Sequence, residues 1–160
     1  MTGWVARNAY DGKPVTVGSV AKDAAIGAAS GVGGALAARA VGKIVVSTTL
    51  RSLASSTKGP AKVGAAYDRT TGEVFKDVSG QPHPELAPPL EAQAPNPSLE
   101  PWKPCNCAET KAANRAVNAG SKLENLTVGA AKTKKGTLVP PCQNCQQTLK
   151  GVKFVTPPQR

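Results

Sequence analysis

The segment from Pro104 to Cys145 contains all four cysteines of the chain, in two close pairs. It opens with Pro-Cys-Asn-Cys-Ala-Glu at residues 104–109 and closes with Pro-Cys-Gln-Asn-Cys at residues 141–145. Close cysteine pairs of this kind are typical of metal ligands or redox sites, whereas disulfide frameworks are typical of small secreted domains. The segment therefore predicts a metal site whose ligands come from two distant parts of the chain.

The residue types of the two motifs favour zinc. Thiolates bind Zn²⁺ at about 2.3 Å in tetrahedral geometry, and a catalytic zinc ion keeps one position open for water. Cys142 and Cys145 are three residues apart at the expected start of a helix, so both can face one ion. Cys107 is expected at the start of another helix, where the dipole stabilises a thiolate. We predict these three cysteines as zinc ligands, with Glu109 beside the open position to transfer protons.

Cys105 leaves a second interpretation open. It lies two residues before Cys107 and can serve as a fourth ligand, which would close the site and make it structural. Three features favour the catalytic interpretation. A structural site does not need Glu109, both ligand groups lie at expected helix starts, and the separation of Cys107 from Cys142 leaves room for one helix and one strand.

The sequence within and after this segment predicts two helices and two strands. Strong helix formers occupy residues 107–119, with Asn106 as the expected N-cap. Residues 126–131 predict a strand, residues 142–149 a second helix and residues 152–155 a last short strand. Strand, helix and strand in this order predict a parallel crossover with helices packed on a sheet.

The residues before the first cysteine pair predict a hairpin followed by a long loop. Residues 62–68 and 73–78 read as two strands, and Gly72 suits the turn between them. Residues 79–104 contain eight prolines, which exclude a continuous helix or a central strand. His83, in this loop, is the only histidine, and we expect an exposed residue rather than a ligand because it has no partner at a ligand spacing.

The N-terminal third differs in composition, and we divide the chain into an Ala/Gly-rich helical lead-in at 1–55 and a zinc domain at 56–160 that includes the proline-rich loop. The uncharged run at residues 24–38 is 15 residues long, shorter than the roughly 20 that span a bilayer. We therefore expect a pliable helix, or two helices broken near Gly33, and no stable membrane insertion. Residues 44–53 are expected to continue as a helix.

The net charge of +10 is unevenly distributed. Residues 1–60 carry +5, residues 61–100 carry −3 and residues 101–160 carry +8. The positive charge is therefore densest around the cysteines, where it would attract a polyanion such as nucleic acid. The basic turn that contains Lys134 and Lys135 favours a polymeric substrate over a free nucleoside.

The two motifs resemble those of the zinc-dependent deaminase superfamily and, more narrowly, those of the YwqJ-like toxin deaminases of bacterial polymorphic toxin systems. The matching residues are Cys107-Ala108-Glu109 and the Pro-Cys-x-x-Cys of residues 141–145. The resemblance covers about residues 61–155. It implies a three-layer α/β/α sandwich with a mixed sheet of four to five strands, and a catalytic zinc ion.

The resemblance also implies an activity, namely hydrolytic deamination of a nucleobase, most often cytosine to uracil. It further implies a bacterial toxin that is secreted or delivered into a target cell, acts in the cytoplasm and has a partner immunity protein. Single- or double-stranded DNA is favoured over RNA as the substrate. The alternatives are a non-catalytic, basic structural-zinc module that binds nucleic acid, and a membrane-active protein in which the Ala/Gly-rich segment acts.

Candidate substrate contacts follow from the same resemblance. A target base must be accessible or flipped out of the helix, and it usually stacks on an aromatic side chain. Trp102, just before the first cysteine pair, is the best aromatic candidate. Ala108, Lys134 and Lys135 are the further predicted contacts.

Overall fold

The computed structural model describes residues 15–16 and 34–159. The elements in chain order are β1 (Val15–Thr16), α3 (Gly34–Ser56), β2 (Lys62–Asp68), β3 (Glu73–Val78), α4 (Pro88–Gln93), the 3-10 turn η3 (Pro104–Asn106), α5 (Ala108–Asn118), the 3-10 turn η4 (Leu123–Asn125), β4 (Leu126–Lys132), β5 (Leu138–Val139), α6 (Gln143–Thr148) and β6 (Lys153–Phe154).

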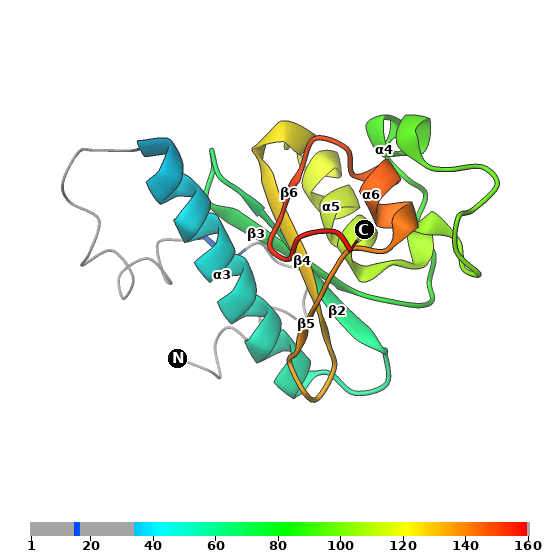
Figure 1. The fold of residues 1–160 in the computed structure, drawn as a ribbon, viewed down its shortest axis with the longest axis horizontal. Helices are drawn as coiled ribbons and strands as arrows, with labels where there is room; N and C mark the ends of the chain where they lie inside the picture. The colour runs from blue at the N-terminus through cyan, green and yellow to red at the C-terminus, as the bar shows by residue number, and fades with distance from the viewer. Residues whose placement is uncertain (1–14, 17–33, 160) are drawn as a thin grey trace.

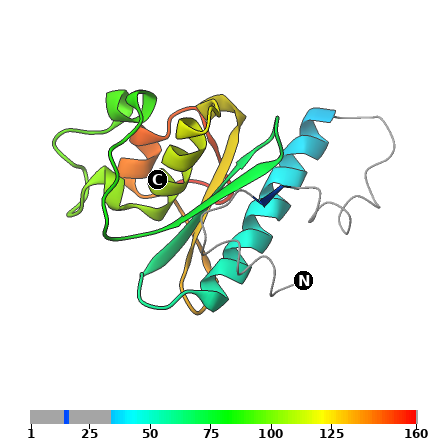
Figure 2. The same ribbon diagram turned by 180° about the vertical axis from the view of Figure 1, so that it is seen from behind.

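These elements form a three-layer α/β/α sandwich, as the sequence predicts. Figures 1 and 2 show α3 on one face of the sheet and α5 and α6 on the other. Side chains alternate between the faces along β2, so that Val63 packs toward α3 and Ala66 toward α5. The sheet thus separates two apolar cores, and the cysteines lie on the α5 side.

The sheet is mixed, with the order β1-β3-β2-β4-β5. Its long pairs, β2 with β3 and β2 with β4, are antiparallel. β5 and β6 both pair with β4, and β6 runs parallel to it. The predicted parallel crossover from β4 through α6 to β6 is therefore confirmed, whereas the two-residue strand β5 was not predicted.

Several boundaries follow the sequence closely, and two local predictions are wrong. The hairpin strands β2 and β3 have the predicted limits, and α5 lies within the predicted helix. Asn106 is not the N-cap of α5, because Cys107 holds that position and the Asn106 side chain contacts His83 instead. His83 is accordingly half-buried rather than exposed.

The proline-rich segment contains a short helix that the sequence did not predict. α4 has prolines in its first turn, where a missing backbone N–H leaves no hydrogen bond unmade. Leu90 anchors the helix because its side chain is fully buried against the α5-side core. The proline-rich segment is therefore packed against the core where it forms α4.

α3 forms one layer of the sandwich. Its residues Val45, Val46 and Leu50 are buried in the core on that face. The layer thus comes from residues that the sequence analysis placed mainly in the lead-in, with the predicted helix at 44–53 confirmed. The predictions for residues 17–33 lie outside the described residues. None of the described helices has the length and apolar character needed to cross a membrane.

Candidate metal centre

The folded chain brings three of the four cysteines together at two helix starts. Cys107 is the N-cap of α5, and Cys142 is the N-cap of α6. Cys145 follows in the first turn of α6 and is fully buried. The Sγ atoms of all three lie within 4.8 Å of one another. The predicted ligand set therefore converges on one point.

The sulfur spacing fits a tetrahedral metal ion. The Sγ atom of Cys142 lies 3.5 Å from that of Cys107 and 3.6 Å from that of Cys145. Zn–S bonds of about 2.3 Å at tetrahedral angles require sulfurs about 3.8 Å apart. A disulfide would need about 2.05 Å, and all four cysteines are free thiols. The three thiols can thus hold zinc, although their chemistry does not by itself specify which soft divalent metal binds.

Cys105 is not part of this group. It lies in η3 with its side chain partly buried, and the metal-ligand group found among the described residues contains only the other three cysteines. A three-thiol set leaves one tetrahedral position for a non-protein ligand, whereas structural zinc sites usually have four protein ligands.

Hydrogen bonds among the sulfurs favour a thiolate at one of the three cysteines, Cys142. The indole N–H of Trp102 donates to Cys107 Sγ over 3.2 Å, and Thr110 Oγ1 lies 3.6 Å from Cys145 Sγ. Hydrogen bonds from the other two thiols lower the pKa of Cys142, which also sits at a helix N-terminus. Hydrogen bonding to Cys142 raises the pKa of Cys107 to about 12, and hydrogen bonding to Cys107 raises the pKa of Cys145, so the metal-free cluster favours a single thiolate.

Glu109 lies beside the cluster in the first turn of α5. Its side chain is only 5% exposed. Burial, reinforced by the nearby Cys142, raises its pKa to about 7 despite the opposing charge of Lys62. A carboxyl group with a pKa near neutrality can both accept and donate a proton, as proton-transfer catalysis requires.

A cavity of about 200 Å³ opens onto the cluster. Its lining residues are Ala61, Lys62, Ser79, Trp102, Asn106, Cys107, Ala108, Glu109 and Cys142. Trp102 and Ala108, two of the predicted substrate contacts, thus line the cavity, and Trp102 is 38% exposed. Lys134 and Lys135 lie in the β4–β5 turn and do not line the cavity.

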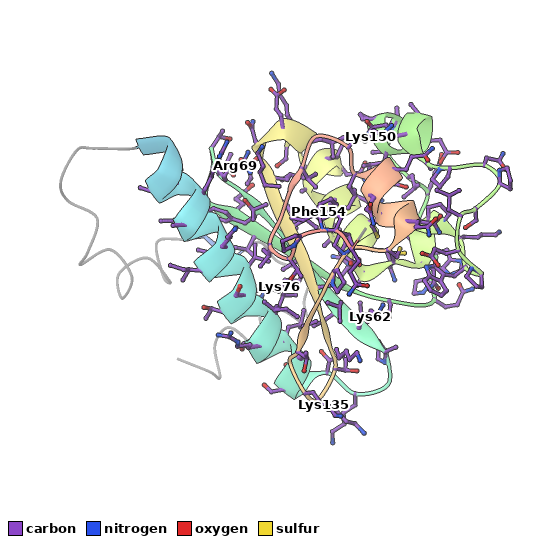
Figure 3. All side chains as sticks on the ribbon, in the orientation of Figure 1. Lys62, Arg69, Lys76, Lys135, Lys150 and Phe154 are labelled. Carbon is purple, nitrogen blue, oxygen red and sulfur yellow. The ribbon has the colours of Figure 1, made fainter. Side chains whose placement is uncertain are left out.

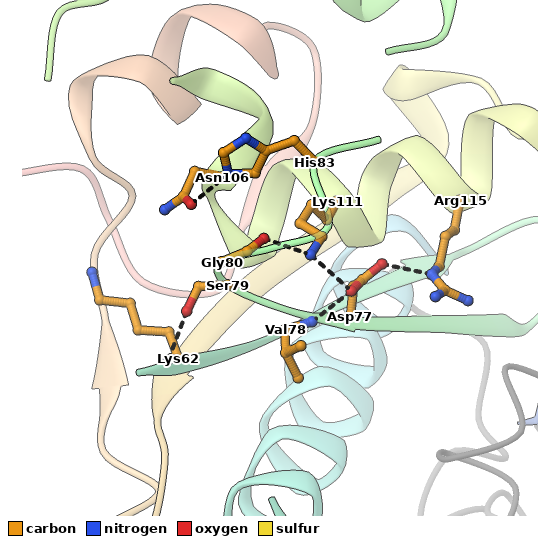
Figure 4. Close-up of polar contacts among 9 residues, drawn as sticks. All are labelled: Lys62, Asp77, Val78, Ser79, Gly80, His83, Asn106, Lys111 and Arg115. Carbon is orange, nitrogen blue, oxygen red and sulfur yellow. Dashed lines mark hydrogen bonds and ion pairs between the residues drawn. The ribbon is translucent and has the colours of Figure 1, made fainter. Parts of the chain in front are cut away.

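A polar network fixes the part of the cavity wall that contains Ser79 and Asn106 (Figure 4). The buried Lys111 donates to Gly80 O over 3.0 Å and lies 3.5 Å from Asp77. Gly80 N in turn donates to Asn106 O, and Asn106 Oδ1 lies 2.8 Å from His83 Nε2. The end of β3 and the start of the proline-rich segment are thus tied to α5, which keeps Asn106 at the cavity.

Asn144, inside the second cysteine motif, fixes the backbone beside Trp102. Its side chain is fully buried, accepts a hydrogen bond from Leu99 N and donates one to Trp102 O. These bonds hold the backbone that carries Trp102 against α6. The motif residue between Cys142 and Cys145 therefore positions the predicted stacking surface. The sequence analysis did not identify Asn144, Lys62 or Ser79 as site residues. The signals available in the sequence were the position of Asn144 inside the cysteine motif and the positions of Lys62 and Ser79 at strand ends.

Gly64 on β2 sets the distance between the sheet and the start of α5. A Cβ atom at this position would overlap the carbonyl group of Ala108 and crowd Glu109 N. The helix that carries two site residues therefore rests directly on the backbone of β2. A side chain at Gly64 would force the first turn of α5 to move.

We expect Gly64→Ala to weaken zinc binding by about tenfold or more, because the displaced turn carries Cys107 and Glu109. Gly129→Ala on the neighbouring strand is the matched control, since a Cβ there meets Val46 and Leu50 on the opposite face. Both variants should lose stability by overpacking. Chelator competition should show weaker zinc binding for Gly64→Ala alone. Equal affinities in the two variants would refute this role of Gly64.

Comparisons with protein-family models, with curated proteins and with solved structures found no match to this chain. The sequence motifs are therefore supported by the site alone, which has three thiols able to hold a metal ion and a buried acid in the wall of a cavity.

Proposed function

We propose that this protein is a zinc-dependent nucleobase deaminase that acts on nucleic acid, with cytosine to uracil as the favoured reaction. The observation that carries the proposal is the buried Glu109 next to a three-thiol cluster that opens into a cavity. A structural zinc site needs neither the acid nor the cavity. The YwqJ-like motif agrees with this chemistry.

Each site residue has a distinct task in this proposal. Cys107, Cys142 and Cys145 would hold the zinc ion, which when bound supplies an acidified water molecule. Glu109 would accept one proton of the attacking water and pass it to the ring nitrogen, and would then carry the second proton of that water to the departing amine. Water and cytosine thus become uracil and ammonia. Trp102 forms the rim on which the target base stacks.

The biological setting is proposed from the family resemblance. The protein would be a bacterial toxin that is secreted or delivered into a target cell and acts in its cytoplasm. A cognate immunity protein would protect the producing cell. DNA, single- or double-stranded, is favoured over RNA as the substrate.

The test is incubation of zinc-loaded protein with single- and double-stranded DNA, with RNA and with free cytidine. Sequencing of the polymers and ammonia release from the nucleoside report deamination. We expect C-to-U conversion with at least one polymer and none with Glu109→Ala. Zinc bound at one per chain, with no deamination of any substrate, would refute the enzyme and favour a structural-zinc module that binds nucleic acid.

A further inference from the structure

Two lysines face each other at the end of the sheet nearest the cavity. Lys62 of β2 and Lys132 of β4 are directly paired in the antiparallel register. Both point to the α5 side, because their neighbours Val63 and Ala131 belong to the core on the α3 side. Like charges directly opposite each other destabilise a sheet. A bound polyanion would remove this repulsion.

The turn after β4 extends this positive charge. Lys134 and Lys135 are exposed in the turn, which is held beside the start of β2 by Thr133 N donating to Ala61 O. Figure 3 shows Lys62 and Lys135 toward one end of the molecule and Lys150 toward the other. We call Lys62, Lys132, Lys134 and Lys135 the basic edge.

Although the charge of Lys62 acts on Glu109 across the cavity, no salt bridge joins the basic edge to an acidic side chain among the described residues. The salt bridges found there join Asp77 to Lys111 and Arg115. Asp77 of β3 pairs with Gly64 of β2, two residues from Lys62. Its carboxylate is already bound by Lys111 and Arg115. The charge of the four lysines therefore remains available to a ligand.

The basic edge begins inside the wall of the cavity. Lys62 lines the cavity together with Glu109 and Cys142. A volume of about 200 Å³ is smaller than pockets for drug-sized ligands, so it suits one base rather than a longer piece of a strand. A strand with its target base in the cavity must continue over the adjoining surface.

We propose that a nucleic-acid strand with an unpaired target base leaves the cavity over the basic edge, with its phosphates on Lys62 and Lys132. This inference rests on the proposed function and adds to it the path of the strand and the two lysines that hold its phosphates. Lysine–phosphate contacts release counterions, so the logarithm of the affinity falls with the logarithm of the salt concentration by about 0.7 per neutralised phosphate of a single strand.

The test uses zinc-loaded protein with Glu109→Gln, so that the probe, a fluorescently labelled single-stranded oligodeoxynucleotide, is not consumed. Binding is measured by anisotropy over a range of salt concentrations. We expect the added pair Lys62→Gln and Lys132→Gln to lower the affinity about tenfold or more and to reduce the salt slope by about 1.4. The matched control pair is Lys122→Gln and Lys150→Gln, which removes the same charge from exposed positions outside the basic edge. Equal losses in both pairs would overturn the proposal.

Deamination by protein with an intact Glu109 separates this inference from the proposed function. If the basic edge carries the strand, Lys132→Gln should slow deamination of the oligonucleotide while free cytidine is deaminated as before. Deamination of both substrates without any dependence on Lys132 would overturn the basic edge and leave the enzyme standing. Oligonucleotide binding that depends on the edge, without deamination, would support the surface and refute the enzyme.

Discussion

Glu109→Gln is expected to lower deamination by orders of magnitude and, at the same time, to make the metal-free protein more stable at pH 8. The carboxyl group is buried, and desolvation raises its pKa to about 7, with the charge of Cys142 adding to the shift. In the unfolded chain it ionises near its ordinary value of about 4.3. The native state therefore holds this proton more tightly than the unfolded state.

The pH dependence follows from that order. Below about pH 4 the carboxyl group is protonated in both states and contributes no difference. Between the two pKa values the unfolded state releases the proton first, so stability falls as pH rises, and the loss is complete above pH 7. A shift of this size corresponds to about 4 kcal/mol. Glutamine avoids this loss because it does not ionise.

Urea denaturation of both proteins in the presence of a chelator, at pH 4 and pH 8, checks the stability half of the prediction. We expect nearly equal free energies of unfolding at pH 4 and a more stable Glu109→Gln variant at pH 8. Activity should fall by about 10²–10⁴-fold, the usual contribution of a proton-transfer group. A variant that is less stable at pH 8 would show that the fold favours the carboxylate, and an active one would show that Glu109 does not carry the proton.

The second large effect is expected on zinc binding when single cysteines are replaced. Three of the four cysteines should be required, and Cys105 should not. Serine at Cys107, Cys142 or Cys145 should reduce bound zinc from one ion per chain to almost none, because each removes one of three converging thiols. Zinc bound by cysteine-rich sites contributes about 10–16 kcal/mol of binding free energy, so the thermal stabilisation by zinc should disappear as well.

Cys105→Ser is the matched control. It makes the same chemical change two residues from Cys107, at a cysteine that lies outside the metal-ligand group. Metal analysis after gel filtration should find one zinc ion per chain in this variant, as in the unchanged protein. Zinc loss in Cys105→Ser, equal to the loss in Cys142→Ser, would show that Cys105 is a ligand and that the site is closed.

The sequence predicts the site-bearing half of the fold well because its signals there are local. Alternating side chains and the turn glycine Gly72 define β2 and β3, and the run of helix formers defines α5. The spacing of Cys142 and Cys145 places both at a helix start, and Cys107 lies at another. Their convergence then follows from a crossover that packs both helices on one face of the sheet.

What the sequence did not predict depends on contacts between distant residues. Asn144 reads as an ordinary motif position, and only the folded chain shows its bonds to the backbone at Leu99 and Trp102. Lys62 looks like the polar start of a strand until its register with Lys132 is known. Gly64 gives no turn signal, since its role is to let Ala108 approach the sheet.

X-ray absorption at the zinc edge of the fully loaded protein tests the open, three-thiol centre most directly. Three sulfur ligands at about 2.3 Å and one oxygen or nitrogen ligand are expected, with the same spectrum for Cys105→Ser. Four sulfur ligands, falling to three in Cys105→Ser, would contradict a catalytic site and identify a closed structural zinc centre.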